Sequence, residues 1–241
     1  MNTVIIPTWS NVQYLPGCLE SLFDLTESVD YRAIVIDNGS TDDTVQYLAD
    51  VRKRHPNLTV IRNETNLGFV KATNQGLNQV QPGENVLLLN DDVQVTDPLW
   101  LRRMEDDLGD DIGAVGPVSN FVMGLQQIGL SPQIPKPRHF TNLLIGFCVL
   151  IRSDVFQKVG LLDERFGMGG NDDLDLSIRI AEAGYKLMVE RRSFILHYGA
   201  KSTGRMGEEA YKKMDADTRK ELVAKWGQAK VDTLFTLPEI T

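Results

Sequence analysis

Apolar runs and helix-like patterns alternate along the first half of the chain. Residues 3–7, TVIIP, form a continuous apolar run that predicts a buried strand, and residues 12–25 then follow the 3.6-residue helical period. The same alternation recurs at 31–37 and 41–54, at 58–63 and 68–80, and at 85–90 and 96–108. Strands that are apolar throughout and alternate with helices predict an α/β fold, with a mostly parallel sheet flanked by helices on both faces.

The second half of the chain has a less regular pattern. Residues 112–118 predict another strand, and 119–140, which contain three prolines, are expected to form a loop over one edge of the sheet. Further strands are predicted at 142–151, 185–190 and 193–198, and further helices at 154–159, from 172 to about 183, and at 208–226. Because Tyr211, Met214 and Leu222 share one side of the last helix, we expect it to pack on the domain or on a second subunit of a homodimer.

Composition and charge exclude several classes of protein. The net charge of -8 argues against nucleic-acid binding and against a polybasic membrane patch, which both need clustered Lys and Arg. The longest apolar run, 143–151, is far shorter than the roughly 20 residues of a transmembrane helix. The N-terminal residues lack the basic leader of a signal peptide, so we expect a cytoplasmic protein. Cys18 and Cys148 are interpreted as buried small side chains, since two scattered thiols make no disulfide framework.

Polar residues follow three of the predicted strands. Thr8 and Trp9 follow the first strand, Asp37 and Asn38 end the second, and 90–92, Asn-Asp-Asp, follow the strand at 85–90. The carboxyl ends of parallel strands lie at one edge of a sheet, here called the rim, where such sheets bind ligands. The sequence therefore predicts that these three clusters meet at one binding site.

Two of these clusters have more than one interpretation. Asp91 and Asp92 could bind Mg²⁺ or Mn²⁺ together with a diphosphate, or could form a solvated turn. Trp9 could stack on a base or belong to the core, and Asp37 could accept a hydrogen bond from a base or belong to a turn. His197, at another strand end, is a candidate second metal ligand. No Walker loop and no Gly-rich dinucleotide loop is present.

An acidic cluster opens the helix predicted from residue 172. Asp172, Asp173 and Asp175 would complement the positive N-terminal end of this helix, with Asn171 as its cap. Asp175 is expected to be structural and to pair with Arg179 one turn later.

Seven stretches, in this order, resemble the family 2 glycosyltransferases, which are inverting enzymes with the GT-A fold. They are VIIPTWSN, VIDNGSTDDT, NLGFVKATNQGL, LLLNDDV, GFCVLIRSDVFQKVGLLDERF, NDDLDLSIRIAEAGYK and HYG. Within this family the chain is most similar to bacterial rhamnosyltransferase-like enzymes of surface glycans. The resemblance implies a single domain over 1–241, with a nucleotide-binding half (1–98), an acceptor and catalytic half with a small mixed sheet (99–205), and a C-terminal helical segment (206–241).

The resemblance also implies roles for individual residues. Asp173 matches the catalytic base, and Asp172 replaces the usual Glu, with acceptor binding as its expected role. Asp92 and His197 match the ligands of a divalent cation, Mn²⁺ or Mg²⁺. The residues that match the nucleotide-sugar site are Pro7, Thr8, Trp9, Asp37, Asn66, Gly68, Lys71, Asn74, Asn90, Asp91 and Lys201. The loop 197–207, with Lys201 and Arg205, is expected to close over the diphosphate.

We therefore expect a metal-dependent transferase that moves a hexose or deoxyhexose from a UDP- or dTDP-sugar to a hydroxyl of a glycan, lipid-linked or protein acceptor. The absence of a transmembrane segment is compatible with peripheral contact at the inner face of the membrane. The alternative is a non-catalytic nucleotide-sugar-binding or scaffold protein with the same fold. A nucleotidyltransferase is disfavoured because it would need a Gly-rich, basic loop after the first strand, and PTWSNVQYL is neither.

Overall fold

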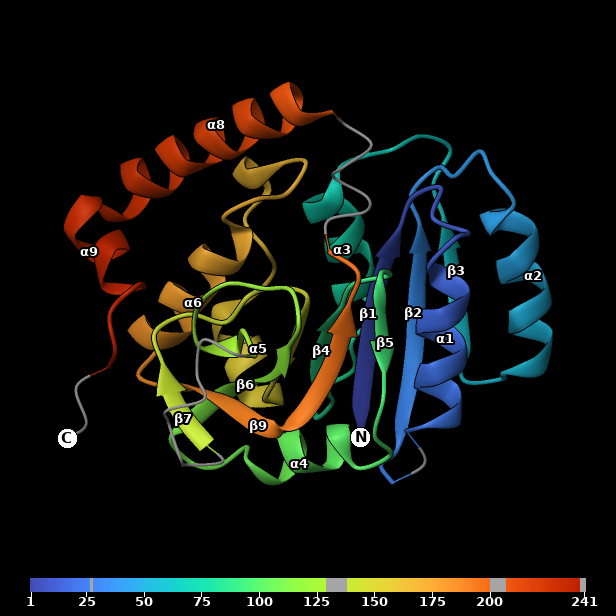
Figure 1. Ribbon diagram of the computed structural model, residues 1–241, viewed down its shortest axis with the longest axis horizontal. Helices are drawn as coiled ribbons and strands as arrows, with labels where there is room; N and C mark the ends of the chain where they lie inside the picture. Colours follow the sequence, from blue (N-terminus) through green and yellow to red (C-terminus); the bar gives the residue numbers. More distant parts are fainter. Residues whose placement is uncertain (27, 129–137, 200–206, 239–241) are drawn as a thin grey trace.

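A mixed sheet runs through the centre of the molecule. The computed structural model describes residues 1–26, 28–128, 138–199 and 207–238, and in this part of the chain the sheet has nine strands in the order β3-β2-β1-β4-β8-β6-β9-β5, with β7 beside β9 (Figure 1). The strands are β1 (Asn2–Thr8), β2 (Tyr31–Asp37), β3 (Leu58–Arg62), β4 (Asn85–Leu89), β5 (Val93–Val95), β6 (Ile112–Ser119), β7 (Arg138–Thr141), β8 (Cys148–Ile151) and β9 (Lys186–His197).

Helices cover both faces of this sheet, as the sequence predicts. They are α1 (Leu15–Asp24), α2 (Thr44–Arg54), α3 (Phe69–Leu77), α4 (Trp100–Asp106), α5 (Ser153–Val159), α6 (Asp172–Glu182), α8 (Glu208–Trp226) and α9 (Gln228–Thr233). Two 3-10 turns, η1 (Gly124–Gln126) and η2 (Glu164–Phe166), lie in the connections. Within the described residues, no helix combines the length and apolar character that a bilayer crossing requires.

The strands explain why both faces are covered. Successive side chains of a strand point to opposite faces, so the unbroken apolar run of β1 feeds two separate cores. Ile5 packs with α3, α5 and α6, whereas Val4 and Ile6 pack with α1, α2 and α4. Cys18 and Cys148 are free and buried, as expected for small apolar side chains.

The second half of the chain contributes the mixed part of the sheet. β1 pairs in parallel with β2 and β4, and β6 pairs in parallel with β9. β8, β7 and β5 run antiparallel to their neighbours. The fold is therefore α/β with a mostly parallel sheet and a smaller mixed portion, which confirms the fold class expected from the sequence.

Three predicted elements differ from the structure. The pieces at 185–190 and 193–198 form one bent strand, β9, whose register to β6 shifts between Pro117 and Val118. The strand expected at 142–151 is shorter and begins at Cys148. The three-residue strand β5 is absent from the prediction, because three residues carry too little periodicity to be recognised.

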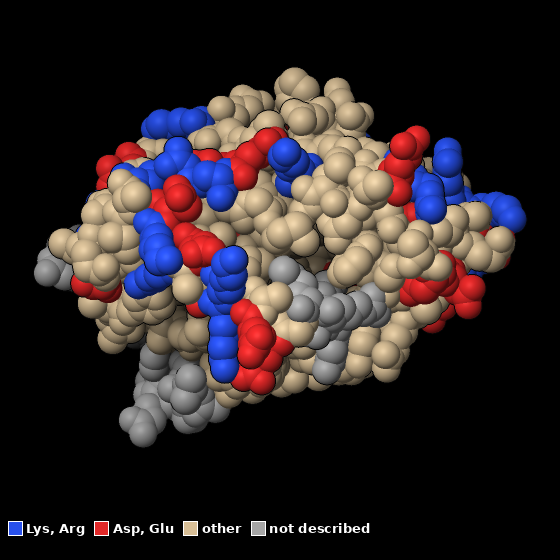
Figure 2. All heavy atoms as spheres, turned by 90° about the horizontal axis from the view of Figure 1, so that it is seen from above, with Lys and Arg blue, Asp and Glu red and all other residues tan. Residues whose placement is uncertain are grey.

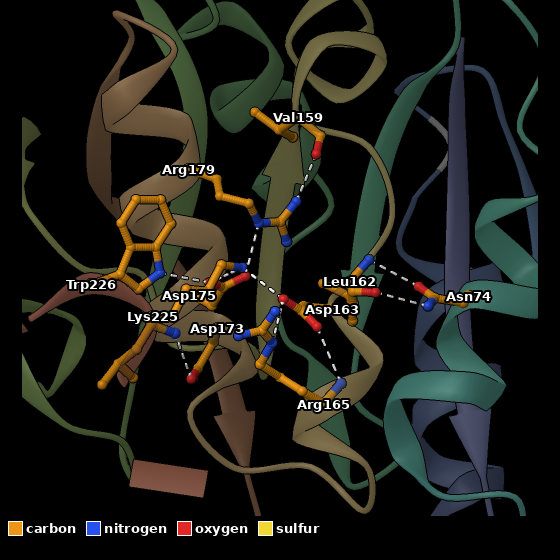
Figure 3. A network of polar contacts seen from close by, with 11 residues as sticks. Asn74, Val159, Leu162, Asp163, Arg165, Asp173, Asp175, Arg179, Lys225 and Trp226 are labelled. Carbon is orange, nitrogen blue, oxygen red and sulfur yellow. Dashed lines mark hydrogen bonds and ion pairs between the residues drawn. The ribbon is translucent and has the colours of Figure 1, made fainter. Parts of the chain in front are cut away.

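The long helix α8 packs on α6 through a buried carboxylate, that of Asp175 (Figure 3). Asp175 is fully buried; its Oδ2 accepts a hydrogen bond from Arg179 Nε at 2.8 Å, and its Oδ1 accepts one from Trp226 Nε1 at 2.8 Å. Lys225 Nζ lies 2.6 Å from Asp175 Oδ1 and 2.7 Å from Asp163 Oδ2. The predicted pair with Arg179 is confirmed, and its burial makes it a much stronger constraint than an exposed pair.

We expect Asp175→Asn to lower the free energy of unfolding by about 3 kcal/mol, because the change removes the carboxylate that pairs with the largely buried Arg179 and leaves Lys225 with Asp163 alone. A matched control is Asp106→Asn, since Asp106 also pairs with an arginine four residues away on a helix, Arg102, at 2.9 Å, but is half exposed. Urea denaturation of the wild type and both variants measures the two changes. Similar losses in the two variants would contradict the structural role assigned to Asp175.

Candidate active site

One large pocket opens at the rim of the sheet, between the two halves of the chain. Its volume is about 550 Å³. The first half of the chain contributes Pro7, Thr8, Trp9, Asn38, Asn66, Phe69, Asn90, Asp91 and Asp92. The second half contributes Met123, Ile145, Gly146, Phe147, residues 168–174, His197, Tyr211, Asp215, Arg219 and Phe235. The three polar clusters that follow strands therefore contribute to one site.

Parallel pairing of β1, β2 and β4 assembles the side of the pocket that the first half of the chain contributes. Thr8 lies opposite Asp37 in the sheet register, and its hydroxyl donates a hydrogen bond to Asp91 Oδ2 at 2.6 Å. Asn38 crosslinks the loops around it, because its Nδ2 donates to Asn66 Oδ1 at 2.8 Å while its Oδ1 accepts from the backbone N–H of Leu67 at 3.0 Å. Asn38 is thus a pocket residue that holds the rim together.

Four residues expected on the nucleotide side do not line the pocket. Asp37 is buried, and its Oδ2 lies 2.5 Å from Arg62 Nη1 while its Oδ1 accepts from the backbone N–H of Ser40. Asn74 is also buried and exchanges two hydrogen bonds of 2.9 Å with the backbone of Leu162. The other two residues are the exposed Lys71 and the glycine at position 68.

Gly68 has a structural reason to be glycine. Its φ is +90°, and a Cβ at this position would lie 2.7 Å from the carbonyl oxygen of Gly167. Close contact between the start of α3 and the loop before α6 therefore requires a residue without a side chain. Lys201 and Arg205, with most of the loop expected to close over the diphosphate, lie outside the described residues.

The pairing of β5 with β9 brings Asp92 against His197. Val93 is paired with His197, and the backbone N–H of Tyr198 donates to the carbonyl oxygen of Asp92 at 2.9 Å. Asp92 Oδ1 and His197 Nε2 are 3.2 Å apart, and both side chains are buried. The ring of His197 stacks on that of Phe147, with centroids 5.2 Å apart.

The two facing atoms suit a divalent cation. His197 Nδ1 lies 2.7 Å from the carbonyl oxygen of Phe121, a partner that can only accept, so Nδ1 carries the proton in the neutral ring. In that tautomer, the lone pair of Nε2 faces the Asp92 carboxylate. Both groups are acceptors, so a cation bound between them would stabilise the pair. Among the described residues no group of three or more His, Cys, Asp or Glu side chains is arranged to hold a metal. A bound cation would therefore need further oxygen ligands from a diphosphate or from water.

The first turn of α6 brings Asp173 into the same pocket. Its Oδ2 accepts a hydrogen bond from the backbone N–H of Gly146 at 3.0 Å, and its Oδ1 accepts one from the backbone N–H of Leu174 at 2.9 Å. Burial raises the pKa of Asp173 above its usual value, and the two backbone hydrogen bonds act in the opposite direction. A carboxylate with a raised pKa in a fixed position is suited to accept a proton.

Asp172 lies beside this carboxylate in the same pocket. Burial, and next the negative charge of Asp173, raise the pKa of Asp172 from 3.8 to about 7. Both neighbouring carboxyl groups therefore have raised pKa values, for which burial is the first cause. Carboxyl groups with raised pKa values that lie together in a pocket are a feature of sites that exchange protons.

The sequence predicts that the side chain of Asn171 caps α6. In the structure it does not. It occupies the N-cap position in the left-handed conformation, at φ 64°, and makes no side-chain capping bond. Its Nδ2 instead donates to Thr218 Oγ1 at 3.0 Å and to Asp215 Oδ1 at 3.3 Å. The amide therefore ties the start of the helix that bears Asp173 to α8.

Several pocket residues were not predicted from the sequence to belong to a site. Met123, Met168, Tyr211, Asp215, Arg219 and Phe235 line the pocket on its second-half side. For α8, the spacing of Tyr211, Asp215 and Arg219, four residues apart, could have placed these three on one helical face. Nothing local could have shown that this face turns toward the rim, because α9 and the buried contacts of Asp175 fix its orientation.

A family model and known proteins match the chain. The model, described as glycosyl transferase family 2, matches residues 3–160. The N-acetylglucosaminyl-diphospho-decaprenol L-rhamnosyltransferase of Mycobacterium tuberculosis is 29% identical over 84% of this chain and 77% of that protein. The uncharacterized protein y4gI of Sinorhizobium fredii is 25% identical over 84% of this chain, which spans only 25% of that relative.

A solved structure shares the fold. The mannosyltransferase PcManGT from Pyrobaculum calidifontis, in complex with GDP-Man and Mn²⁺, has a TM-score of 0.67 and 18% sequence identity, over 96% of this chain and 73% of that chain. At this level of identity the likeness concerns the arrangement of the elements in space.

We expect Asp172→Asn to stabilise the protein at pH 8 but not at pH 4. Because the pKa of Asp172 is raised to about 7 in the folded state, the folded protein binds more protons than the unfolded chain between pH 4 and 7, and its stability falls as the pH rises through this interval. Asparagine cannot ionise, so it removes the cost of ionising residue 172 in the folded state. The gain in the free energy of unfolding at pH 8 should be on the order of 1–3 kcal/mol.

Urea denaturation at both pH values, with the exposed Asp110→Asn as control, measures the difference. A gain of the same size at pH 4 and pH 8 would show that the ionisation of Asp172 is not its cause.

Proposed function

The chain belongs to glycosyl transferase family 2, and from this premise we propose that it is an inverting, metal-dependent glycosyltransferase. In this proposal it moves a hexose or deoxyhexose from a UDP- or dTDP-sugar to a hydroxyl of a glycan, lipid-linked or protein acceptor. The mycobacterial relative is named for transfer of rhamnose, a deoxyhexose, and for N-acetylglucosaminyl-diphospho-decaprenol, which is lipid-linked; its name supports the deoxyhexose and the lipid-linked acceptor of this proposal.

One observation carries the proposal. Asp92 and His197 on one wall, and Asp173 on another, line a single pocket at the rim. An inverting transfer needs these two functions on opposite sides of the anomeric carbon, one to stabilise the departing diphosphate and one to deprotonate the incoming hydroxyl. A protein that only binds nucleotide sugars would not need a carboxylate placed to deprotonate an acceptor hydroxyl.

Asp173 accepts the proton in the proposed reaction. The oxygen of the acceptor hydroxyl attacks the anomeric carbon while its proton passes to Asp173, and the bond to the diphosphate breaks with its electron pair leaving on the diphosphate oxygen. The N–H groups of Gly146 and Leu174 hold the carboxylate in place throughout. Asp172 is proposed to contact the acceptor, because its carboxyl group lies in the same pocket.

Asp92 and His197 are proposed to hold Mn²⁺ or Mg²⁺ for the donor diphosphate. The cation would supply Lewis-acid stabilisation of negative charge on the leaving group. Pro7, Thr8, Trp9, Asn66, Asn90 and Asp91 would surround the nucleotide, and Asp37, Gly68, Lys71, Asn74 and Lys201 remain part of the proposed donor site as the sequence resemblance implies. A cytoplasmic location and a homodimer belong to the proposal on the sequence argument alone.

The first test is a thermal-shift panel of UDP, dTDP and GDP, each with and without Mn²⁺. A ligand at a hundredfold excess over its Kd stabilises the folded state by about 2.7 kcal/mol, which raises the Tm of a protein of this size by roughly 5–10 °C. We expect UDP or dTDP to give this shift with Mn²⁺, and His197→Ala to remove the Mn²⁺-dependent part. His55→Ala is the control, because His55 stacks on Phe23 at 3.8 Å and does not line the pocket.

Shifts that are the same with and without Mn²⁺, or the same in His197→Ala, would contradict the metal site. If GDP gave the only shift, the proposed donor nucleotide would be wrong while the metal site could still stand.

The second test concerns Asp173. We expect Asp173→Asn to lower the slow hydrolysis of the donor by about a hundredfold or more, since a positioned base contributes that much, and to leave the nucleotide-dependent thermal shift unchanged. Proton NMR of the released sugar should show the anomer opposite to that of the donor. Asp110→Asn, an exposed carboxylate outside the pocket, is the matched control.

Near wild-type hydrolysis in Asp173→Asn would refute its role as the base. Absence of hydrolysis in the wild type, together with strong nucleotide binding, would favour the alternative of a binding protein.

A further inference from the structure

Large apolar side chains surround the pocket on its second-half side while remaining exposed. Met123 is 59% exposed, Met168 41%, Tyr211 41% and Phe235 57%, and all four line the pocket. They come from four separate segments of the chain, so this is a property of the fold and not of one apolar stretch. Contiguous exposed apolar side chains at the mouth of a pocket indicate contact with an apolar group.

The inner face of α8 supplies polar groups to the same side. Tyr211, Asp215 and Arg219 are spaced by four residues, so they lie on one side of the helix about 6 Å apart along its axis. Asp215 Oδ1 accepts the hydrogen bond from Asn171 at 3.3 Å, which places it next to the first turn of α6 and its Asp173. The guanidinium of Arg219 lies over the ring of Phe235, 5.3 Å from its centroid.

This wall is held in a fixed position. The C-terminal end of α8 is anchored on α6 by the bonds from Trp226 and Lys225 to Asp175 (Figure 3). The middle of α8 is tied to Asn171 through Thr218. The Oγ1 of Thr218 also lies 3.3 Å from the position that a Cβ on Gly170 would take. The face of α8 that lines the pocket is therefore fixed relative to Asp173.

The charges of the rim surface are distributed unevenly. Figure 2 shows a band of Lys, Arg, Asp and Glu side chains at the left, over α8, and a second group at the right, over α2. The hollowed surface between them carries mostly other residues. The hollowed surface, where described residues form it, is therefore poorer in charged side chains than the surfaces over α8 and α2.

We propose that this wall binds an acceptor glycoside with an apolar aglycone. The acceptor sugar lies between Asp173 and α8, where Asp215 and Arg219 contact its hydroxyl groups, and its aglycone lies across Met123, Tyr211 and Phe235. The proposal rests on the proposed function, because it is the position of the base that requires the acceptor hydroxyl to be at Asp173. The nucleotide would occupy the opposite side, which leaves this wall to the acceptor.

The test compares two lengths of aglycone on the same sugar. Octyl and methyl β-D-glucoside, and octyl and methyl N-acetyl-β-D-glucosaminide, are titrated calorimetrically into protein saturated with Mn²⁺ and the nucleotide that gives the largest thermal shift. All octyl glycosides are kept below their micelle concentration. We expect at least one octyl glycoside to bind about tenfold more tightly than its methyl counterpart, a ratio for which burial of about two methylene groups suffices.

Three variants separate binding of the aglycone from binding of the sugar. Phe235→Ser and Met123→Ser should each weaken the octyl glycosides more than the methyl glycosides, so that the octyl-to-methyl ratio falls. Arg219→Gln should weaken both to the same extent, because it acts on the sugar. Leu99→Ser is the matched control for an exposed apolar residue, since Leu99 is 47% exposed and lies outside the pocket.

Equal or undetectable binding of octyl and methyl glycosides to the wild type would overturn the proposal. So would a fall in the octyl-to-methyl ratio in Leu99→Ser as large as that in Phe235→Ser, which would mean that the alkyl chain binds elsewhere. These outcomes are distinct from failure of the proposed function, since the protein is titrated only after it has shown a metal-dependent nucleotide shift. Without such a shift, the proposed function itself fails.

Discussion

The constraint on which the site depends is the cost of collecting carboxylates in one partly buried pocket. Asp91 and Asp92 stand on one wall and Asp172 and Asp173 on another, and each must be compensated because a buried unpaired charge is expensive. Asp91 accepts a hydrogen bond from Thr8, and Asp173 accepts two from backbone N–H groups. Asp172 avoids the cost by holding its proton to about pH 7. Asp92 faces a histidine nitrogen at 3.2 Å, an arrangement that a divalent cation would stabilise.

The sequence predicts well what is local. Alternating strands and helices establish the parallel sheet, and residues that directly follow strands meet at its rim because strand ends do so in any such sheet. Thr8, Trp9 and Asp91 are therefore found in the pocket without knowledge of contacts. A local pattern can also have two outcomes: Asp37 ends a strand like the others, yet in the structure its carboxylate contacts Arg62 and it does not line the pocket.

Long-range contacts account for the remainder. β5 has only three residues, yet its pairing with β9 brings Asp92 within 3.2 Å of His197, and no periodicity could reveal it. Asn171 stands at a helix start and is the residue type that caps helices, but the approach of α8 offers its amide other partners. Burial of Asp175 is likewise invisible locally, because it results from Trp226, 51 residues away. Each failure occurs where a contact between distant segments overrides a local preference.

Helix α6 links the proposed base, Asp173, to helix α8 on the facing wall of the pocket. Asp173 and Asp175 are two residues apart, and on a helix this spacing directs them to different sides. Asp173 points into the pocket, where backbone groups hold it without neutralising it, whereas Asp175 points toward α8, where cations and an indole N–H satisfy it fully. A displacement of α6 would therefore move the base and α8 together and preserve the distance between them. This coupling gives a physical reason for the fully buried, multiply bonded carboxylate of Asp175, two residues from the proposed base. It keeps α8, the proposed acceptor wall, at a fixed distance from Asp173.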